Sequence, residues 1–333
     1  MALDPALRAR LALPAVCAPM FLVTGPALVR EACKAGLIGG IPRQNARTLE
    51  QFDAWLGEIR RDLDAFAAEH PDAPIGPIAV NLAVRLSGEE LAQEMEVCRR
   101  HGVEIIISVA GDPTALIAQV HDFGGKVFHD VTNLRFAEKA VAAGADGLTC
   151  IGAGGGGHSG TISHLALIPK IRAIYDGTII MAGAIGDGAA IRAAEILGAD
   201  LAYIGTRFIA TQESDAPRAY KDLLVSETSR GLRFTDALGG APANWIVESL
   251  RLAGLDPDNL PAPEGRRGYD HLPENARPWR DFWSAGQSID LIEDIPSVAE
   301  LCARLRREYI AACAVPDMAR SARLAEAAYE AGA

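Results

Sequence analysis

The stretch TIIMAGAIGDGAAIRAAEILGADLAYIGTRF, residues 178–208, predicts one complete strand–helix–strand unit. Its two ends, Thr178–Ala182 and Leu201–Gly205, are short runs that are apolar on both faces, as in parallel strands that are covered on both sides. Between them, Asp187 is a suitable N-cap for a helix that ends at Gly198. Such a unit is typical of α/β folds, in which parallel strands alternate with helices.

Segments of the same kind precede this unit. The further predicted strands are Ala15–Ala18, Leu37–Ile41, Ile78–Leu82, Glu104–Val109, Lys126–His129 and Gly147–Ile151. Helical patterns separate them, so eight strands alternate with helices, which predicts a closed (β/α)8 TIM barrel. An open doubly wound sheet is the alternative, but it more often has about six strands and a glycine-rich turn after the first one. Here the largest glycine cluster follows the sixth strand, which favours the barrel.

The pattern changes after the eighth strand. Residues 208–295 contain polar stretches rich in proline and glycine, with helical fragments near 216–230 and 243–252. A clear helical stripe resumes at Val298–Cys313. We therefore expect a barrel domain made of residues 1–207 and 296–333. Residues 208–295 are expected to form a small, mostly helical insertion or lid domain over the C-terminal mouth of the barrel.

Composition limits the classes of function. The chain has 333 residues, of which 49% are hydrophobic, and a net charge of −11 with no basic run. Disorder is excluded by the apolar content, and nucleic acid and membranes are poor partners for such a surface. The six cysteines are scattered without a C-x-x-C pair, which indicates reduced thiols and a cytoplasmic protein, and no metal site has the usual spacing.

The glycine-rich stretch after the sixth strand is the first candidate site. Residues 152–160 contain six glycines and present a single imidazole, that of His158. Glycine costs conformational entropy on folding, so such a loop is expected to serve a purpose, namely close approach of the backbone to a flat ligand. The alternative is a flexible linker in which His158 is incidental; its position between two apolar elements favours function.

The loops after the seventh and eighth strands are the second candidate site. They contain Gly183-Ala184 through Gly188 and Gly205-Thr206. In TIM barrels these two loops, with a helix N-terminus, commonly bind a phosphate group. Each glycine alone is equally explained by a tight turn, and the two loops together predict a phosphate site. His129-Asp130 ends the fifth strand and faces the same mouth, where a structural pair and a functional pair remain alternatives.

The residues at these positions resemble the nitronate monooxygenases, formerly called 2-nitropropane dioxygenases, which are FMN-dependent barrels. The segments that carry the resemblance are Ala18-Pro19-Met20, Val80-Asn81-Leu82, Gly156-Gly157-His158-Ser159-Gly160, Ala182-Gly183-Ala184 through Gly188, Gly198 through Phe208, and Trp283 through Gln287. The likeness spans most of the chain. Its most specific parts are the Gly-Gly-His-x-Gly and Gly-Thr-Arg-Phe segments.

This resemblance implies roles for individual residues. Pro19, Met20 and Phe21 would lie against the flavin ring, Asn81 near the ring or the substrate, and Gly156 close to the cofactor. Gly183, Ala184, Gly205 and Thr206 would bind the FMN phosphate, Gln287 would touch flavin or substrate, and His158 matches the catalytic histidine. Two positions depart from the family: Asp130 stands where a lysine is frequent, so we expect it beside the flavin with altered electronic tuning, and Ala184 stands where a second glycine is frequent.

The activity implied is oxidation of alkyl nitronates or nitroalkanes with O2, with His158 as the general base. The nearest alternative on the same barrel is an FMN-dependent NAD(P)H:quinone or enoyl-thioester reductase. A non-redox barrel that binds a sugar phosphate and a non-catalytic flavin carrier are further alternatives. NAD(P)H is thus a second candidate partner beside the small-molecule substrate and O2, and a homodimer is one assembly compatible with the sequence.

Overall fold

The computed structural model describes residues 3–83, 88–238, 240–261 and 269–314. Eight parallel strands form a closed barrel in sequence order, with the first strand hydrogen-bonded to the second and to the eighth. The strands are β1 (Ala15–Cys17), β2 (Ile38–Pro42), β3 (Ile78–Ala83), β4 (Ile105–Val109), β5 (Lys126–Val131), β6 (Gly147–Ile151), β7 (Thr178–Ala182) and β8 (Leu201–Ile204). The predicted α/β TIM barrel is confirmed, and every predicted strand overlaps an observed one.

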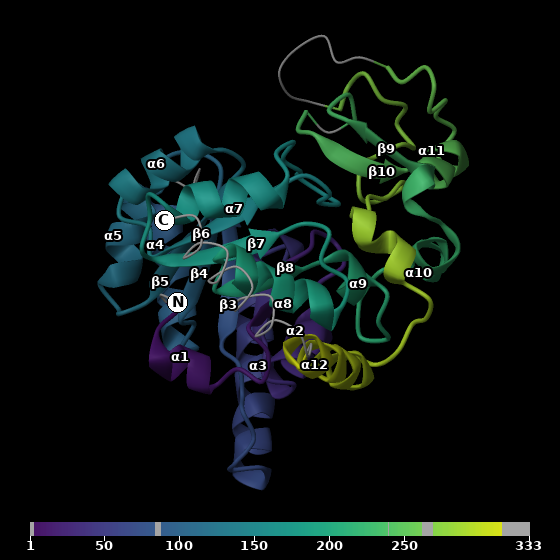
Figure 1. Ribbon diagram of the computed structural model, residues 1–333. Coiled ribbons are helices and arrows are strands. Elements are labelled where there is room, and N and C mark those ends of the chain that lie inside the picture. The colour runs from purple at the N-terminus through teal and green to yellow at the C-terminus, as the bar shows by residue number, and fades with distance from the viewer. Residues whose placement is uncertain (1–2, 84–87, 239, 262–268, 315–333) are drawn as a thin grey trace, which may run out of the picture.

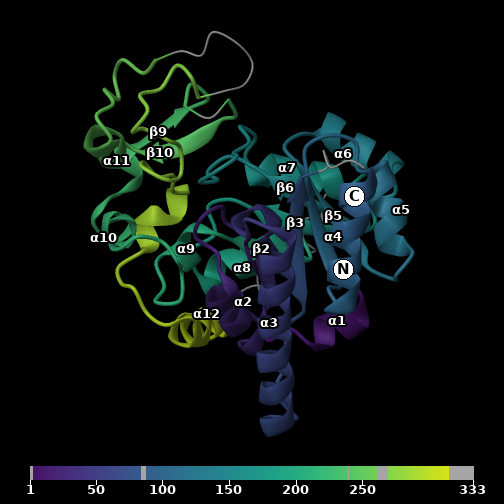
Figure 2. The same cartoon turned by 180° about the vertical axis from the view of Figure 1, so that it is seen from behind.

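Helices surround this barrel, as Figures 1 and 2 show from opposite sides. The helices of the described residues are α1 (Pro5–Ala9), α2 (Pro26–Lys34), α3 (Leu49–Glu69), α4 (Gly88–Arg100), α5 (Thr114–His121), α6 (Leu134–Ala142), α7 (His164–Arg172), α8 (Gly188–Leu197), α9 (Thr206–Ile209), α10 (Arg218–Ser226), α11 (Val247–Leu252) and α12 (Val298–Cys313), with short 3₁₀ turns η1 (Arg43–Asn45), η2 (Ser229–Gly231) and η3 (Gln287–Leu291). Of these, α10 and α11 lie apart from the barrel, beside β9 and β10 (Figure 1). The caps of α8 are as predicted. Asp187 accepts a hydrogen bond from the Ala190 N–H at 2.7 Å, and Gly198 ends the helix at φ 104°.

Apolar side chains fill the part of the barrel interior next to the N-terminal segment. One buried cluster joins inward-facing strand residues to the N-terminal segment, and it consists of Leu3, Leu7, Leu11, Val16, Ile38, Ala79, Ile105, Ile107, Phe128, Ile180 and Leu201. Because side chains alternate along a strand, the residues two positions later face the interior one layer higher. These are polar on three strands: Asn81 on β3, Asp130 on β5 and Tyr203 on β8. The buried cluster therefore forms an apolar plug in the barrel, and Asn81, Asp130 and Tyr203 form a polar layer on its C-terminal side.

The segment 208–295 contains helices, as expected, and also an antiparallel pair that the sequence analysis does not predict. The strands are β9 (Leu232–Thr235) and β10 (Ala243–Ile246). The fragment expected to be helical over 243–252 begins as β10 and becomes helical only at Val247. Asn244 explains the difference, because its N–H donates to Gly156 and its carbonyl accepts from Ala285. These tertiary hydrogen bonds outweigh the local helical pattern.

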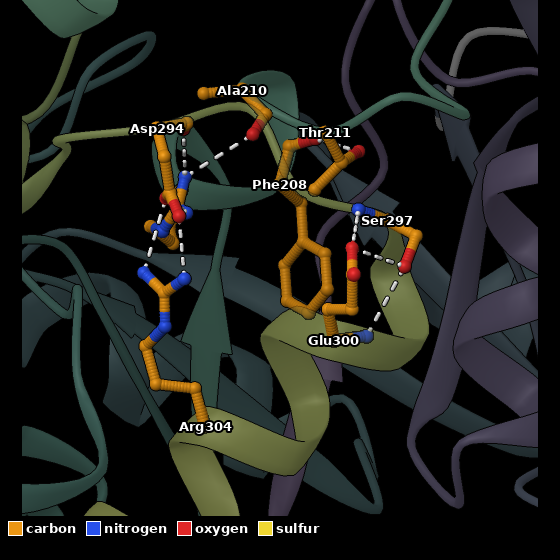
Figure 3. A network of polar contacts seen from close by, with 8 residues as sticks. Phe208, Ala210, Thr211, Asp294, Ser297, Glu300 and Arg304 are labelled. Atoms are coloured by element: carbon orange, nitrogen blue, oxygen red, sulfur yellow. Dashed lines mark hydrogen bonds and ion pairs between the residues drawn. The ribbon is translucent and has the colours of Figure 1, made fainter.

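A network of polar contacts connects the end of this segment to the barrel (Figure 3). Arg207, directly after Thr206, is 1% exposed and donates to the carbonyl of Ala210 and to the carboxylate of Asp294, the latter at 2.7 Å. Asp294 also pairs with Arg304 of α12, which packs on α8 and α2. Buried Arg207 therefore fixes the loop after β8 to the end of the insertion. Within the described residues, no helix has the length and apolar character needed to span a bilayer.

Candidate active site

A cavity of about 410 Å³ opens at the C-terminal ends of the barrel strands. Its wall includes all but one of the residues predicted for the site: Pro19, Met20, Phe21, Asn81, Asp130, Gly156, His158, Gly183, Ala184, Gly205 and Thr206. Gln287 is the exception. Its side chain is exposed and lies against Gly154, whereas its neighbours Gly286 and Ser288 face the cavity.

The glycine loop after β6 is held by the insertion. Asn244 of β10 donates its backbone N–H to the Gly156 carbonyl at 2.9 Å and its side-chain amide to the Gly155 carbonyl at 2.6 Å. On the other side, the Gln287 N–H donates to the Gly154 carbonyl at 2.9 Å. A Cβ on Gly156 would lie 2.8 Å from the Gly286 nitrogen. These contacts fix the loop and disfavour the alternative of a flexible linker.

His158 projects from this loop into the cavity, beside Trp279 of the insertion. The side chain keeps contact with solvent through the mouth of the cavity. The surrounding protein nevertheless removes part of its hydration, and this desolvation lowers the pKa of His158 below the usual 6.5. The imidazole is therefore neutral near pH 7 and able to accept a proton.

The loops after β7 and β8 form the part of the wall that adjoins the glycine loop. Gly183 has φ 117° and Ala184 φ 57°, so both adopt the left-handed region. At position 184, where a second glycine is frequent in the family that the sequence resembles, this positive φ costs an alanine about 1–2 kcal/mol. Thr206 is oriented by the insertion, because its hydroxyl accepts a hydrogen bond from the Gly286 N–H at 2.8 Å.

The helix N-terminus expected at this phosphate site has another partner. Gly188, the first residue of α8, donates its N–H to the Glu308 carboxylate of α12 at 2.9 Å, and Asp187 caps the same turn. A phosphate group would therefore be bound by the backbone of the two loops and by Thr206, and not by the first turn of α8.

The floor of the cavity is the polar layer above the barrel plug. The side-chain amide of Asn81 donates to the Ile107 carbonyl at 3.2 Å. Oδ1 of Asp130 and Oγ1 of Thr149 are buried and have no hydrogen-bond partner among the described residues. Burial raises the pKa of Asp130 to about 7, against the smaller opposite effect of the Thr149 hydroxyl. His129 points away from the cavity, with Nδ1 2.8 Å from the Ser108 hydroxyl, so Asp130 is the member of that pair that faces the site.

Four aromatic residues of the wall are missing from the sequence-based site: Trp279, Tyr269, Tyr220 and Tyr203. Trp279 has φ 63° and forms an edge contact with Phe21, with ring centroids 6.4 Å apart. Tyr269 and Tyr203 also line the cavity. Trp279 and Tyr269 lie in irregular chain, where no periodic pattern indicates the direction of a side chain. Tyr203 could have been found, because strand alternation places it inward between Leu201 and Gly205.

The polar atoms of the observed wall fit a flavin ring. A Cβ at Gly156 or at Gly183 would meet neighbouring backbone, at 2.8 Å and 3.0 Å respectively, so these glycines allow the loops of the cavity wall to pack closely on one another. The orphaned Asp130 Oδ1 and Thr149 Oγ1 provide polar atoms that a ring system with donors and acceptors would satisfy. Within the described residues, no group of three or more His, Cys, Asp or Glu side chains could hold a metal ion.

Comparison with known proteins gives the same family along nearly the whole chain. A family model described as nitronate monooxygenase matches residues 11–308. A nitronate monooxygenase of Paraburkholderia phytofirmans is 29% identical over 89% of this chain and 92% of its own length. A (3aS,4S,5R,7aS)-5-hydroxy-7a-methyl-1-oxo-octahydro-1H-indene-4-carboxyl-CoA dehydrogenase of Mycobacterium tuberculosis is 28% identical over 71% of this chain and 64% of its own length.

Solved structures show the same barrel. FabK from Thermotoga maritima superimposes with a TM-score of 0.72 at 25% identity, over 93% of this chain and 96% of that one. A nitroalkane oxidase from Streptomyces ansochromogenes gives a TM-score of 0.73 at 24% identity, over 93% and 99% of the two chains. With the family model matching most of its length, this protein belongs to the nitronate monooxygenase family and is a flavin-dependent oxidoreductase.

Proposed function

We propose that this protein binds FMN and oxidises alkyl nitronates or nitroalkanes with O2, using His158 as a general base. The observation that supports this most directly is the position of the His158 imidazole in the wall of the same cavity as the loops after β7 and β8. The family match supports the reaction class, and the relative from Paraburkholderia phytofirmans is named nitronate monooxygenase.

The residues divide into those that would hold the cofactor and those that would act on the substrate. Gly183, Ala184, Gly205 and Thr206 would hold the phosphate through backbone N–H groups and one hydroxyl. Pro19 and Met20 would contact the face of the ring, with Asn81 and Asp130 below its polar edge. When bound, the flavin supplies the electron acceptor and the reaction with O2.

His158 would act before any electron transfer. A neutral nitroalkane loses its α-proton as the C–H bond breaks, and the imidazole accepts that proton. The electron pair of the broken bond moves onto the nitro group, so the resulting nitronate carries its negative charge on oxygen. The imidazolium formed at the same time is then placed to attract this charge and hold the anion in the cavity. A preformed nitronate needs no such proton transfer.

Oxygen consumption tests the proposal. The purified protein, loaded with FMN, should consume O2 with propionate 3-nitronate and with nitroethane, and the flavin should copurify as a yellow chromophore. A colourless protein that binds no flavin would contradict the assignment and favour a non-redox sugar-phosphate barrel. A yellow protein without oxidase activity toward either substrate would favour the carrier or the reductase.

The reductase remains a second candidate because one relative has a CoA thioester in its name, the carboxyl-CoA dehydrogenase of Mycobacterium tuberculosis. Anaerobic mixing with NADH or NADPH separates the two functions. Rapid bleaching of the flavin absorbance by either nucleotide would favour an NAD(P)H-dependent reductase. A cytoplasmic location and a homodimer are further parts of the proposal, and sedimentation velocity of the FMN-loaded protein tests the dimer.

A further inference from the structure

Asp130 is an acidic side chain on the floor of the cavity, and its Oδ1 is buried without a well-formed hydrogen bond among the residues that the structure describes. Along β5, Phe128 belongs to the apolar plug, His129 turns outward to Ser108, and Asp130 returns inward, where it lines the cavity with Asn81. Its Oδ1 is shielded from solvent and makes no hydrogen bond of normal geometry to the described residues, although the Thr149 hydroxyl is near enough to lower the pKa of the carboxyl group slightly. Buried polar atoms in folded proteins are nearly always paired, so this atom calls for a ligand partner.

The surroundings of Asp130 provide no positive charge. Across the sheet, Thr149 is its register partner on β6, with Cys150 next to it. Tyr203 of β8 and Asn81 of β3 complete the polar layer. None of these groups is a cation, and no cationic side chain in the described ranges contributes to the electrostatics of Asp130. An ionised carboxylate would therefore lack a counter-charge in a partly dehydrated site, which is unfavourable.

Burial raises the pKa values of Asp130 and of two neighbouring groups, and the negative charge of Asp130 contributes to the rise at both neighbours. Burial, and after it the negative charge of Asp130, raises the pKa of the Tyr203 hydroxyl well above its usual value. The pKa of Cys150 is also raised, chiefly by burial, with Asp130 adding to it. The pKa of Asp130 rises to about 7, so its protonated form is accessible near neutral pH.

We propose that Asp130 binds the flavin as a neutral carboxyl group and donates a hydrogen bond from its own proton to an acceptor atom on the ring. This inference rests on the proposed function in one respect, namely that the cavity binds FMN. The rim of an oxidised flavin carries acceptors at N1, O2, O4 and N5, and its one donor there is the N3–H. A neutral carboxyl group suits the acceptors, whereas a carboxylate facing them would be repelled.

This assignment predicts that flavin binding and protonation are linked. A hydrogen bond donated to the ring stabilises the protonated form, so the pKa of Asp130 is higher in the complex than in the free protein. Binding then takes up a proton at a pH between these two values. Over that interval the dissociation constant for FMN rises with pH by up to about tenfold per pH unit.

Two measurements on the full chain test the proposal without using enzyme turnover. The first is titration with FMN from about pH 6 to pH 9, followed by flavin fluorescence, for the wild type and for Asp130→Asn. The ratio of the two dissociation constants removes the titration of the FMN phosphate, which both proteins share. The second is calorimetry in two buffers of different ionisation enthalpy, which counts the protons taken up on binding. Asp122→Asn, a change at an exposed residue on the end of α5, is the matched control.

The wild type and the Asp122→Asn variant should take up a proton as FMN binds near pH 8, and Asp130→Asn should not. The ratio of dissociation constants, wild type over Asp130→Asn, should rise with pH by about tenfold per unit. Proton release by the wild type would overturn the proposal, because it would mean that a carboxylate accepts from the ring N3–H. Equal uptake by Asp130→Asn would also overturn it and leave the proposed function intact. A wild type that binds no FMN would overturn both.

The calorimetric result on the wild type alone decides between donor and acceptor. The proposal therefore stays testable if the Asp130→Asn variant folds poorly.

Discussion

The imidazole of His158 stacks against the indole of Trp279, with ring centroids 6.0 Å apart and planes inclined by 29°. The indole is itself held by Trp245, whose ring centroid lies 5.1 Å away, and by the edge contact with Phe21. Trp279 belongs to the insertion and His158 to the barrel. The insertion therefore supplies part of the wall beside the proposed base, and desolvation by the surrounding protein lowers the pKa of His158.

Replacing Trp279 by alanine should raise the pKa of His158 toward 6.5, because water would reach the face of the ring now covered by the indole. The pH dependence of kcat/KM for nitroethane reports this pKa in the free enzyme. The acidic limb of that profile should move to higher pH in Trp279→Ala. Trp279→Phe keeps an aromatic face and should stay close to the wild type. Identical profiles for all three proteins would contradict the role of the stack.

Gly156→Ala should impair closure of the insertion on the glycine loop. Its Cβ would lie 2.8 Å from the Gly286 nitrogen and 3.0 Å from the Ala285 carbonyl carbon, and this peptide unit is backbone that leaves little room to adjust. We expect a loss of about 1–3 kcal/mol in the free energy of unfolding. Gly157→Ala is the matched control, because its Cβ meets nothing within 4 Å. Urea denaturation of both variants checks the difference, and equal stability would contradict the packing argument.

Asp294→Ala should destabilise the protein more than Arg304→Ala does. The first change leaves the Arg207 guanidinium, 1% exposed, without its carboxylate partner. Loss of one partner from a buried pair costs about 3–5 kcal/mol. Asp294 is 42% exposed, so water can replace part of the contact and we expect about 1–3 kcal/mol. Arg304 is 37% exposed, and its loss should cost about 1 kcal/mol or less. Thermal unfolding compares the two, and the opposite order would be inconsistent with Arg207 as the central residue.

The barrel could be predicted because its signals are local. Apolar runs such as Thr178–Ala182, the N-cap Asp187 and the terminating Gly198 each constrain their own few residues, and the structure confirms them. The site residues at the C-terminal ends of the strands could then be predicted, because a closed parallel barrel brings all these ends together at one mouth. That argument places His158, Gly183 and Thr206 in one cavity although they lie far apart in sequence.

The insertion could not be predicted to the same depth because its structure depends on partners distant in sequence. Residues 243–246 form a strand because they pair with β9, and Asn244 bonds in addition to the glycine loop on one side and to Ala285 on the other. Trp279 enters the cavity wall from a turn with positive φ, which no pattern of hydrophobic residues indicates. The raised pKa of Asp130 likewise comes from burial beneath the mouth, and the sequence shows only that an acid stands at the end of a strand.

The pKa of Asp130 also makes a prediction about stability. The pKa is about 7 in the folded protein and about 3.9 in an unfolded chain. Between these values the folded state keeps a proton that the unfolded state loses, so this residue makes the protein less stable as pH rises toward 7. Asp130→Asn lacks this effect. Its free energy of unfolding relative to the wild type should therefore increase by about 2–3 kcal/mol between pH 5 and pH 8.

Urea denaturation of the flavin-free wild type and variant at the two pH values measures this difference. Other titrating groups are common to both proteins and cancel in the comparison. A difference that is the same at both pH values would show that Asp130 is ionised in the folded protein at pH 5, against the effect of its burial.

His158→Ala should separate the two kinds of substrate. A neutral nitroalkane needs a base to remove its α-proton, and loss of a general base typically reduces turnover by about 10²- to 10⁴-fold. A preformed nitronate has already lost that proton, so its turnover should fall far less, by the loss of the imidazole as a binding group. His158→Gln keeps a hydrogen-bonding side chain of similar size and should recover part of the nitronate binding without recovering nitroethane turnover. Both variants should retain the flavin absorbance of the wild type, because the loops at Gly183 and Gly205 are unchanged.

In the wild type, nitroethane turnover should rise with pH through the lowered pKa of His158, since only the neutral imidazole accepts a proton. Oxygen-electrode assays with nitroethane and with propionate 3-nitronate measure all of these rates, and a flavin-loaded His158→Ala variant that turns over nitroethane at the wild-type rate would remove His158 from the reaction.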